Sequence, residues 1–437
     1  MASVETLGAL ERRINATIPQ QQLRGEVEAR LIRLGRTAKV HGFRPGKVPL
    51  KVLEQQYGAQ VHQEVLGDAL QRTFAETAQA NRLKVAGNPD FEIKNADPDV
   101  EEIEFSATFE VYPEVNFGNI TQEKIERDIY TLNDADVDHT INTLRKQRAV
   151  FETCNRAAQN EDQVRIDFNG TLDGQPFEGG EGRNFNVVLG SGRMLPEFEQ
   201  AIVGMTAGQT KSFDMTFPDN YHGKDVAGKS VRFTLTVHAI EAPRLPELDA
   251  KFAMSVGIED GDLNRLKAEI RKNLSHEIER RLKVRNKNHA MDALLRTSQL
   301  DVPKALLEAE SRHIVQQTLR DMKERGVKVP AGMSLPSDLF TERAQRRVKL
   351  GLIAGELVKL HGLTPKPEQI KALLKEYAQS FDRPEEVIKW HYSDPSRLQA
   401  VENMALEDNI VAWVMNAATV TDKMMDFDEL MEKIDNA

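Results

Sequence analysis

The fold of the middle of this chain is decided by the stretch VRFTLTV at residues 231–237. Every second side chain in it is apolar, which is the pattern of a β-strand with one buried face. The same alternation recurs at Val164, Ile166 and Phe168, and turns rich in glycine and aspartate separate such stretches. Seven of the 18 phenylalanines fall between residues 168 and 233. We therefore predict a small strand-rich domain with little helix, built around an aromatic core or pocket.

The segment before this domain combines helices with a strand. Apolar residues recur at helical spacing from Leu23 to Leu34, and the opposite face carries Arg30, Arg33, Arg36 and Lys39. A further helix is expected from Leu53 to Phe74, and the alternation from Ile103 to Val111 predicts a half-buried strand. We expect an N-terminal domain at residues 1–112, closed by Pro113.

Residues 113–149 are predicted to form a linker between these two domains. Asn133 and Asp134 are helix-capping residues, and they precede Val137, Ile141 and Leu144 at helical spacing. The linker should therefore contain a capped helix.

The loop HGFRPGKVP at residues 41–49 ends the basic helix, because two glycines and two prolines stop a helix. Arg44 and Lys47 place positive charge beside the aromatic ring of Phe43. Arginine pairs with phosphate and an aromatic ring stacks or fills a pocket, so the loop suits contact with structured RNA and an adjacent protein. A tight turn with Phe43 packed inward and its cations merely solvated fits the composition equally well.

From Pro246 onward the chain is predicted to be helical, which gives a C-terminal domain at residues 246–437. Apolar residues from Leu263 to Leu282 form one stripe along a long, charged helix, and shorter helices follow. Amphipathic helices provide the adaptable apolar surface that a protein binding many sequences needs. Met404 and Met415 suit such a surface, but their helical spacing fits an ordinary core as well.

Composition narrows the class of protein. The 437 residues suffice for about three domains, and 40% hydrophobic with 29% charged residues is typical of soluble globular proteins. The start lacks the pattern of a secretory signal, and no apolar run is long enough to span a membrane. Cys154 is the single cysteine, which fits a reducing compartment, so we expect a cytoplasmic protein. A net charge of −10 disfavours general binding to nucleic acid, and we expect neither DNA nor a membrane as a partner.

The stretch GFRPGKVP at residues 42–49 resembles the ribosome-docking signature of trigger factor, a family of bacterial nascent-chain chaperones and prolyl isomerases. Further stretches resemble that family in the expected order: YG at 57–58, VLGD at 65–68, FEVYPEV at 109–115, VP at 302–303 and RRVKLGL at 346–352. The resemblance implies that Phe43, Arg44 and Lys47 contact a protein and ribosomal RNA of the large subunit beside the exit tunnel. Pro45 stands where many members carry a basic residue.

The same resemblance implies a chaperone that holds nascent and unfolded polypeptides in the cytoplasm. It also implies roles in protein transport, the cell cycle and cell division. Whether the chain forms a homodimer when it is not bound to the ribosome stays an open alternative.

The middle domain, at residues 150–245, resembles peptidyl-prolyl isomerases of the FKBP type. The resemblance rests on IDFNG at 166–170, FEGG at 177–180, LGSGRMLPEF at 189–198, and FP at 217–218 with Tyr221. It implies an antiparallel sheet wrapped on a short helix. It also implies an apolar cleft with an acid at its edge, lined by Phe168, Phe177, Glu178, Phe185, Met194, Leu195, Phe198, Tyr221 and Phe233.

Such a cleft needs no nucleophile, metal or cofactor, and we expect none. Rotation about a peptide bond must overcome a barrier of about 18–20 kcal/mol, and a dry cleft lowers it by binding the twisted amide better than the planar one. For any single phenylalanine, plain core packing is the simpler interpretation. The runs Gly179-Gly180 and Gly190-Ser191-Gly192 are interpreted as turns, because the sequence around them lacks a complete nucleotide-binding motif.

We therefore predict a multidomain α+β protein: an α/β N-terminal ribosome-docking domain, an FKBP-like antiparallel sheet domain, and an all-α C-terminal domain with projecting helices. One alternative is a free-standing prolyl isomerase whose helices serve dimerisation, but such a protein has no use for the loop at 41–49. Another is an RNA-binding regulatory protein, which the basic helix allows and the acidic total opposes.

Overall fold

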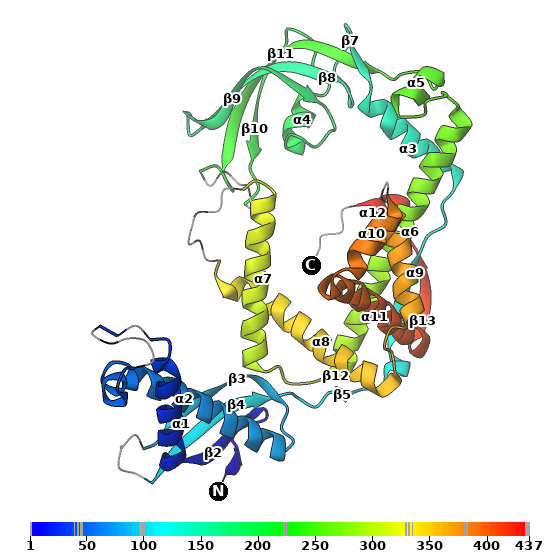
Figure 1. The fold of residues 1–437 in the computed structure, drawn as a ribbon. Helices are drawn as coiled ribbons and strands as arrows, with labels where there is room; N and C mark the ends of the chain where they lie inside the picture. Colours follow the sequence, from blue (N-terminus) through cyan, green and yellow to red (C-terminus); the bar gives the residue numbers. More distant parts are fainter. Residues whose placement is uncertain are drawn as a thin grey trace. The chain divides into compact units, whose positions relative to one another are not determined.

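A computed structural model describes residues 2–38, 40, 41, 43, 47–95, 101–219, 221, 223, 225–327, 330, 333, 335–379, 381 and 383–432. The chain forms two compact units, each with its own cores. Residues up to Ile129 and Lys283–Met424 belong to the first unit, and Tyr130–Leu282 with Met425–Glu432 belong to the second. Helices and antiparallel sheets occur together, so the protein is of the multidomain α+β class (Figure 1).

The first unit begins with a four-stranded antiparallel sheet covered by two helices. Its strand order is β1-β2-β4-β3, formed by Ser3–Thr6, Glu11–Pro19, Glu102–Val111 and Val85–Ile93. Ile103, Phe105, Ala107 and Phe109 are buried, so the strand predicted from their alternation is confirmed in β4. Helices α1 (Gln20–Gly35) and α2 (Leu50–Ala80) bury Leu23, Leu31 and Phe74 in the same core. Helix α1 ends at Gly35, before Arg36, so the sequence prediction made this helix too long.

The second unit contains a five-stranded antiparallel sheet of order β10-β11-β8-β9, with β7 on β11. Its strands are β7 (Val150–Thr153), β8 (Gln163–Leu172), β9 (Gln175–Val188), β10 (Thr210–Thr216) and β11 (Ser230–Arg244). The short helix α4 (Pro196–Ile202) lies on one side of the curved sheet (Figure 1). It buries Phe198 and Ile202 against Val164 and Leu235. The stretch 231–237 forms the first half of β11, where this strand pairs with β10 on one side and β8 on the other.

The residues between these sheets are also structured. Strand β5 (Asn116–Phe117) pairs with β12 (Ser298–Gln299), and a 3-10 turn, η1 (Ile120–Gln122), follows it. Strand β6 (Lys124–Ile129) pairs in parallel with β13 (Thr419–Met424). These pairings join residues 116–129 to the distant C-terminal region of the first unit.

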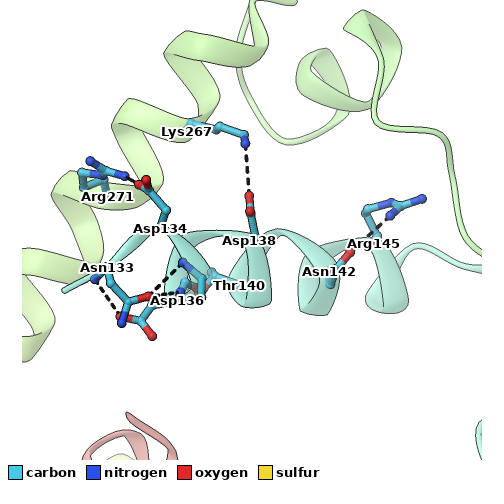
Figure 2. A network of polar contacts seen from close by, with 10 residues as sticks. Asn133, Asp134, Asp136, Asp138, Thr140, Asn142, Arg145, Lys267 and Arg271 are labelled. Atoms are coloured by element: carbon cyan, nitrogen blue, oxygen red, sulfur yellow. Dashed lines mark hydrogen bonds and ion pairs between the residues drawn. The ribbon is translucent and has the colours of Figure 1, made fainter.

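Helix α3 (Asp134–Gln147) follows β6 in the chain and confirms the capped helix predicted there. The Asn133 side chain accepts the Ala135 and Asp136 backbone N–H groups, and Asp136 accepts the Asn133 N–H (Figure 2). Both hydrogen-bond directions of a capping box are present, which satisfies the orphan N–H groups at the helix start. Ion pairs from Arg271 to Asp134 and from Lys267 to Asp138 tie α3 to α6 (Figure 2).

The C-terminal region is helical apart from β12 and β13. Its elements are α5 (Ala250–Ser255), α6 (Leu263–Thr297), α7 (Lys304–Glu324), η2 (Ser337–Phe340), α8 (Thr341–His361), α9 (Pro367–Ala378), α10 (Pro384–Tyr392), α11 (Pro395–Ala417) and α12 (Phe427–Met431). Helix α6 begins in the second unit and continues into the first at Lys283. Among the described residues, no helix is long and apolar enough to cross a membrane.

Candidate functional site

The strongest candidate site is an aromatic cluster centred on Phe233, in the first half of β11. This side chain is only 4% exposed. Its ring centroid lies 5.3 Å from that of Phe198, 6.0 Å from Phe213, 6.2 Å from Phe177, 6.3 Å from Phe168 and 6.4 Å from Phe217. The rings come from β8, β9, β10, β11, α4 and the residue after β10. The pairs with Phe198 and Phe177 are edge-on and the pair with Phe213 is stacked. Favourable aromatic pairs each contribute about 0.5–1.5 kcal/mol beyond area burial, so these contacts stabilise the cluster.

Three glycines make room for these rings. A Cβ atom on Gly170 would lie 2.6 Å from the Phe233 ring, and one on Gly182 would lie 2.4 Å from the Phe168 ring. A Cβ atom on Gly180 would approach the Phe177 ring to 2.8 Å. Gly179 and Gly180 lie within strand β9. The sequence interpretation of this run as a turn was therefore wrong. The turn predicted at Gly190-Ser191-Gly192 is confirmed, and both of its glycines have positive φ.

The edge of the cluster carries the remaining predicted site residues. Phe185 is 41% exposed and packs edge-on against Phe168, with their centroids 5.9 Å apart. Tyr221 packs against Phe217 at 4.6 Å. Met194 and Leu195 are half-buried against the same core. The structure thus brings together all the predicted apolar residues and Tyr221 on one domain.

Glu178 is the one predicted site residue with a carboxylate side chain. Its side chain is exposed and forms no hydrogen bond or ion pair within the described part of the chain. A different carboxylate, that of Glu199, is 6% exposed and accepts the backbone N–H groups of Gly190 and Met194 at 2.7 and 3.3 Å. Glu199 therefore fixes the turn that delivers Met194 and Leu195, a role that sequence analysis did not find.

Two rings of the cluster were also missed in the prediction. Phe213 stacks on Phe233 and also contacts Phe198, and Phe217 contacts Phe177 and Tyr221. Phe213 alternates with polar residues along β10, which is a strand signal that could have found it. Phe217 is part of the dipeptide Phe217-Pro218, which carries the family resemblance, but the sequence prediction gave its aromatic ring no role.

A bulge in β9 places Phe185 beside Phe168. The pairing of β8 with β9 shifts between Ile166 and Phe168, and Asn184 takes a left-handed conformation there, with φ of 48°. The Asp167 carboxylate accepts the Asn184 backbone N–H at 2.7 Å, and its other oxygen lies 2.8 Å from His238 Nε2. The Asn184 N–H first, and His238 second, hold the pKa of Asp167 below its usual value.

The second candidate site is the predicted docking loop between α1 and α2. Phe43 is 41% exposed, whereas the neighbouring Val40 is 5% exposed and anchors the loop in the core. The Phe43 backbone N–H donates to the Val40 carbonyl at 3.1 Å, and Lys47 is exposed. The exposure of Phe43 disfavours the inward-packed turn. Arg44, the third predicted contact, lies outside the described residues, as does Pro45.

No group of His, Cys, Asp and Glu side chains in the described ranges is arranged to hold a metal ion. The rings of the cluster offer apolar packing, and Tyr221 and Glu178 lie among its predicted site residues as the groups that can form hydrogen bonds.

The fold and the cluster together define a class: a multidomain protein that carries an isomerase domain of the FKBP type between its N- and C-terminal parts. Residues 154–238 match the family described as "FKBP-type peptidyl-prolyl cis-trans isomerase". Residues 1–144 match "Bacterial trigger factor protein (TF)", and residues 262–416 match "Bacterial trigger factor protein (TF) C-terminus".

Three relatives agree with these family matches in sequence. Trigger factor of Nitrosospira multiformis is 50% identical over 98% of this chain and 99% of its own. The trigger factors of Laribacter hongkongensis and Burkholderia mallei are 48% and 46% identical, each over 98% of both chains. A solved trigger factor chaperone aligns with 95% of this chain and 100% of its own, at 17% identity and a TM-score of 0.47.

The chain belongs to the trigger factor family. It is a ribosome-associated chaperone with a peptidyl-prolyl isomerase domain of the FKBP type, as the resemblance of its motifs implied.

Proposed function

We propose that X-Pro bonds are isomerised at the aromatic cluster, by the residues Phe168, Phe177, Glu178, Phe185, Met194, Leu195, Phe198, Tyr221 and Phe233. The observation that supports this proposal is the convergence of rings from β8, β9, β10 and α4 on Phe233, beside the exposed ring of Phe185. A proline ring is apolar, and packed aromatic faces exclude water from the amide that must rotate.

The proposed mechanism is differential binding. Twisting an amide breaks its resonance and costs about 18–20 kcal/mol in water. A rigid apolar surface stabilises the twisted amide, which is less polar than the planar one, and so lowers the barrier. The Tyr221 hydroxyl would donate a hydrogen bond to the substrate carbonyl, and Glu178 would face the polar part of the peptide from the edge.

Replacement of Phe198 tests this assignment. Phe198→Ala should reduce kcat/KM for an X-Pro peptide at least about tenfold, because a 2% exposed ring at the centre of the cluster is lost. Tyr221→Phe, which keeps the ring, should reduce it about fivefold through loss of one hydrogen bond. Suppression of client aggregation should stay unchanged in both variants. If Tyr221→Phe and the exposed control Val150→Ala were equally active, the role of Tyr221 would be wrong.

We further propose that Phe43, Arg44 and Lys47 contact the large ribosomal subunit at a protein and RNA beside the exit tunnel. The exposure of Phe43 and Lys47, on the same loop as Arg44, supports this role, and exposed Arg33 and Arg36 add positive charge nearby. Arginine and lysine pair with RNA phosphates, so binding should weaken as salt rises.

Ribosome co-sedimentation tests the docking proposal. The triple variant Phe43→Ala, Arg44→Ala, Lys47→Ala should no longer co-sediment, while isomerase activity persists. A matched control is the triple variant Leu339→Ala, Arg343→Ala, Lys371→Ala. It truncates one exposed apolar side chain, one arginine and one lysine elsewhere in the first unit. Equal sedimentation of the two variants would show that the loop does not dock.

We also propose the clients and the compartment of the protein. Its clients would be nascent and unfolded polypeptides in the cytoplasm. By assisting the folding of such clients, it would contribute to protein transport, the cell cycle and cell division. The single Cys154 suits that reducing compartment. Self-association into a homodimer off the ribosome would be measured by analytical ultracentrifugation.

A further inference from the structure

Strand β11 of the second unit carries a bulge at His238. Val237 of β11 pairs with Ile166 of β8, and Ala239 pairs with the preceding residue of β8, Arg165. His238 is therefore an extra residue without a partner in this part of the sheet. A bulge bends its strand and redirects a side chain, and bulges are frequent next to active sites. The sequence prediction gave His238 no role.

The bulge of β9 lies at the same level of β8, on its other side. Ile166, which pairs with the residue before the bulge of β11, also pairs with Phe185 of β9. Beyond this pair β9 has two residues, Arg183 and Asn184, where β8 has only Asp167. The bulges of two different strands therefore flank one residue of the strand between them, and that residue is Asp167.

The Asp167 carboxylate joins the two bulges. One of its oxygens accepts the Asn184 backbone N–H at 2.7 Å, and the other lies 2.8 Å from His238 Nε2. The pKa of Asp167 is lowered, first by the Asn184 N–H and then by His238, so this carboxyl is ionised at neutral pH. An ionised carboxylate can only accept hydrogen bonds. Nε2 of His238 therefore carries a proton and donates to Asp167.

The contact between Asp167 and His238 lies on the face of the sheet opposite the rings. Ile166 and Phe168 pack in the apolar core, and successive side chains of a strand point to opposite faces, so Asp167 points away from that core. The side chains of His238 and Asp167 are 37% and 39% exposed. An exposed ion pair adds little to the stability of a fold. What this contact fixes is the direction in which the carboxylate points.

Asn184 connects this carboxylate to the aromatic cluster. The backbone of Asn184 is left-handed, with φ of 48°, which is uncommon for a residue other than glycine. Its N–H is held by Asp167, and the next residue, Phe185, packs edge-on against Phe168. Because the ring of Phe185 is 41% exposed, packing constrains it less than the buried rings. A shift of the bulge would therefore move this ring relative to Phe168.

Two arginines near Asp167 do not take the place of His238. Arg183 lowers the pKa of Asp167 by attraction, but its guanidinium is held by Glu181 at 3.0 Å. Arg165 lies two residues before Asp167 on β8 and is exposed. Neither forms an ion pair with Asp167. Within the described part of the chain, His238 is thus the side chain that donates a hydrogen bond to this carboxylate.

We propose that His238 is a positioning residue of the isomerase, which holds Phe185 in place through Asp167 and the Asn184 N–H. This inference rests on the proposed function, in which Phe185 belongs to the site. The hydrogen bond from Nε2 fixes one oxygen of the carboxylate, the other oxygen holds the bulge of β9, and the bulge sets the position of the ring. His238 transfers no proton, so another side chain with an N–H donor at the same place can serve.

Isomerase kinetics of the full chain test this role. His238→Leu should reduce kcat/KM for an X-Pro peptide about threefold, as for the loss of one hydrogen bond. His238→Gln, whose amide places an N–H donor near the position of Nε2, should restore most of the activity. The control Arg232→Leu removes another exposed cation of β11, which pairs with Asp214, and should have no effect. Phe185→Ala should be the most impaired variant, because the ring itself is lost.

A double variant separates action through Asp167 from an independent role of His238. Asp167→Ala and His238→Leu each remove one end of the same contact. If His238 acts only through Asp167, the double variant should have the same kcat/KM as Asp167→Ala alone. Multiplied losses would show that His238 affects the site in another way, and the proposal would be wrong.

Amide hydrogen exchange, followed by NMR on the full chain, gives a readout that does not depend on activity. The Asn184 N–H should exchange at least about threefold faster in His238→Leu than in wild type or His238→Gln, because its acceptor is less fixed. Exchange of the Leu235 N–H, in the paired part of β11, should be unchanged. The proposal is overturned if His238→Leu is fully active, if His238→Gln is equally impaired, or if exchange at Asn184 does not change. Full activity of Phe185→Ala would instead overturn the place of Phe185 in the proposed site, so the two failures are distinguishable.

Discussion

The aromatic cluster of the second unit and the strand junction of the first unit are held together in opposite ways. The cluster draws its rings from residues 168–233 and is fixed by ring contacts and by glycines that let them approach. The junction joins β6 and β13, which lie about 295 residues apart along the chain, to α6. There the buried carboxylate of Asp128 accepts from Arg285 Nε at 2.7 Å and lies 3.2 Å from His289 Nε2.

The Asp128 backbone is bound as well. Its N–H donates to Asn286 Oδ1 at 2.8 Å, and its carbonyl accepts from Asn286 Nδ2 at 2.9 Å. Contacts between aromatic rings thus dominate where the parts are close in sequence, whereas the distant segments are positioned by directional, charged contacts to one residue. The two regions should therefore be destabilised by different changes. A larger side chain should disturb the cluster, whereas the loss of one charge should disturb the junction.

The largest effect is expected from Asp128→Ala. Its side chain is 1% exposed, and removal of one partner of a buried ion pair typically costs about 3–5 kcal/mol. Trp390 and Trp413 both lie in the first unit, so tryptophan fluorescence during urea unfolding reports on it. The control Asp422→Ala removes an exposed ion pair with Arg127 in the same strand pair and should cost less than about 1 kcal/mol. Equal costs would show that the junction does not depend on Asp128.

Gly182→Val should affect the cluster and leave the junction intact. The first added carbon would lie 2.4 Å from the Phe168 ring, and overpacking of this kind costs about 1–3 kcal/mol. Because Phe168 and Phe185 must then move, isomerase activity should fall at least about tenfold, while tryptophan-monitored unfolding stays unchanged. Asn186→Val, at an exposed position of the same strand, is the control. Full activity of Gly182→Val would mean that Phe168 is not needed where it lies.

The two regions also differ in what their sequence predicts. The alternation in 231–237 and the spacing of phenylalanines predicted both the sheet and most of its aromatic residues, because strand period and burial are local properties. Glu199 and the Asn184 bulge were missed, since a buried carboxylate and a register shift depend on backbone positions that no spacing reveals. The parallel pairing of β6 with β13 was missed for a similar reason. Each segment by itself has the sequence pattern of a connecting loop. The docking loop was predicted through resemblance, because its composition left its exposure undecided.

The junction should also respond to acid. Burial alone would raise the pKa of Asp128, but hydrogen bonds from Arg285 and His289 outweigh it, and the pKa is lowered. A carboxyl whose folded pKa lies below its unfolded value of about 3.9 contributes stability above that pH and loses it as pH falls through the folded pKa. The gap in urea midpoint between wild type and Asp128→Asn should therefore stay constant from pH 7 to 5 and narrow below about pH 4. A gap that widens in acid would contradict the assigned direction. Asp301→Asn, at an exposed carboxyl, should follow wild type throughout.

The smallest effect is expected at Asp167, whose carboxylate supports the edge of the cluster. Asp167→Ala leaves the Asn184 N–H without its carboxylate and loosens the bulge before Phe185, so kcat/KM should fall about threefold to fivefold, as for loss of one hydrogen bond. Asp167→Asn keeps an oxygen that can accept this N–H and should restore most of the activity. Glu152→Ala breaks the exposed Arg244 contact on β7 and should have no effect. If Asp167→Asn were as impaired as Asp167→Ala, the charge and not the accepted N–H would matter. The cluster would then share the junction's dependence on a single ionised carboxylate.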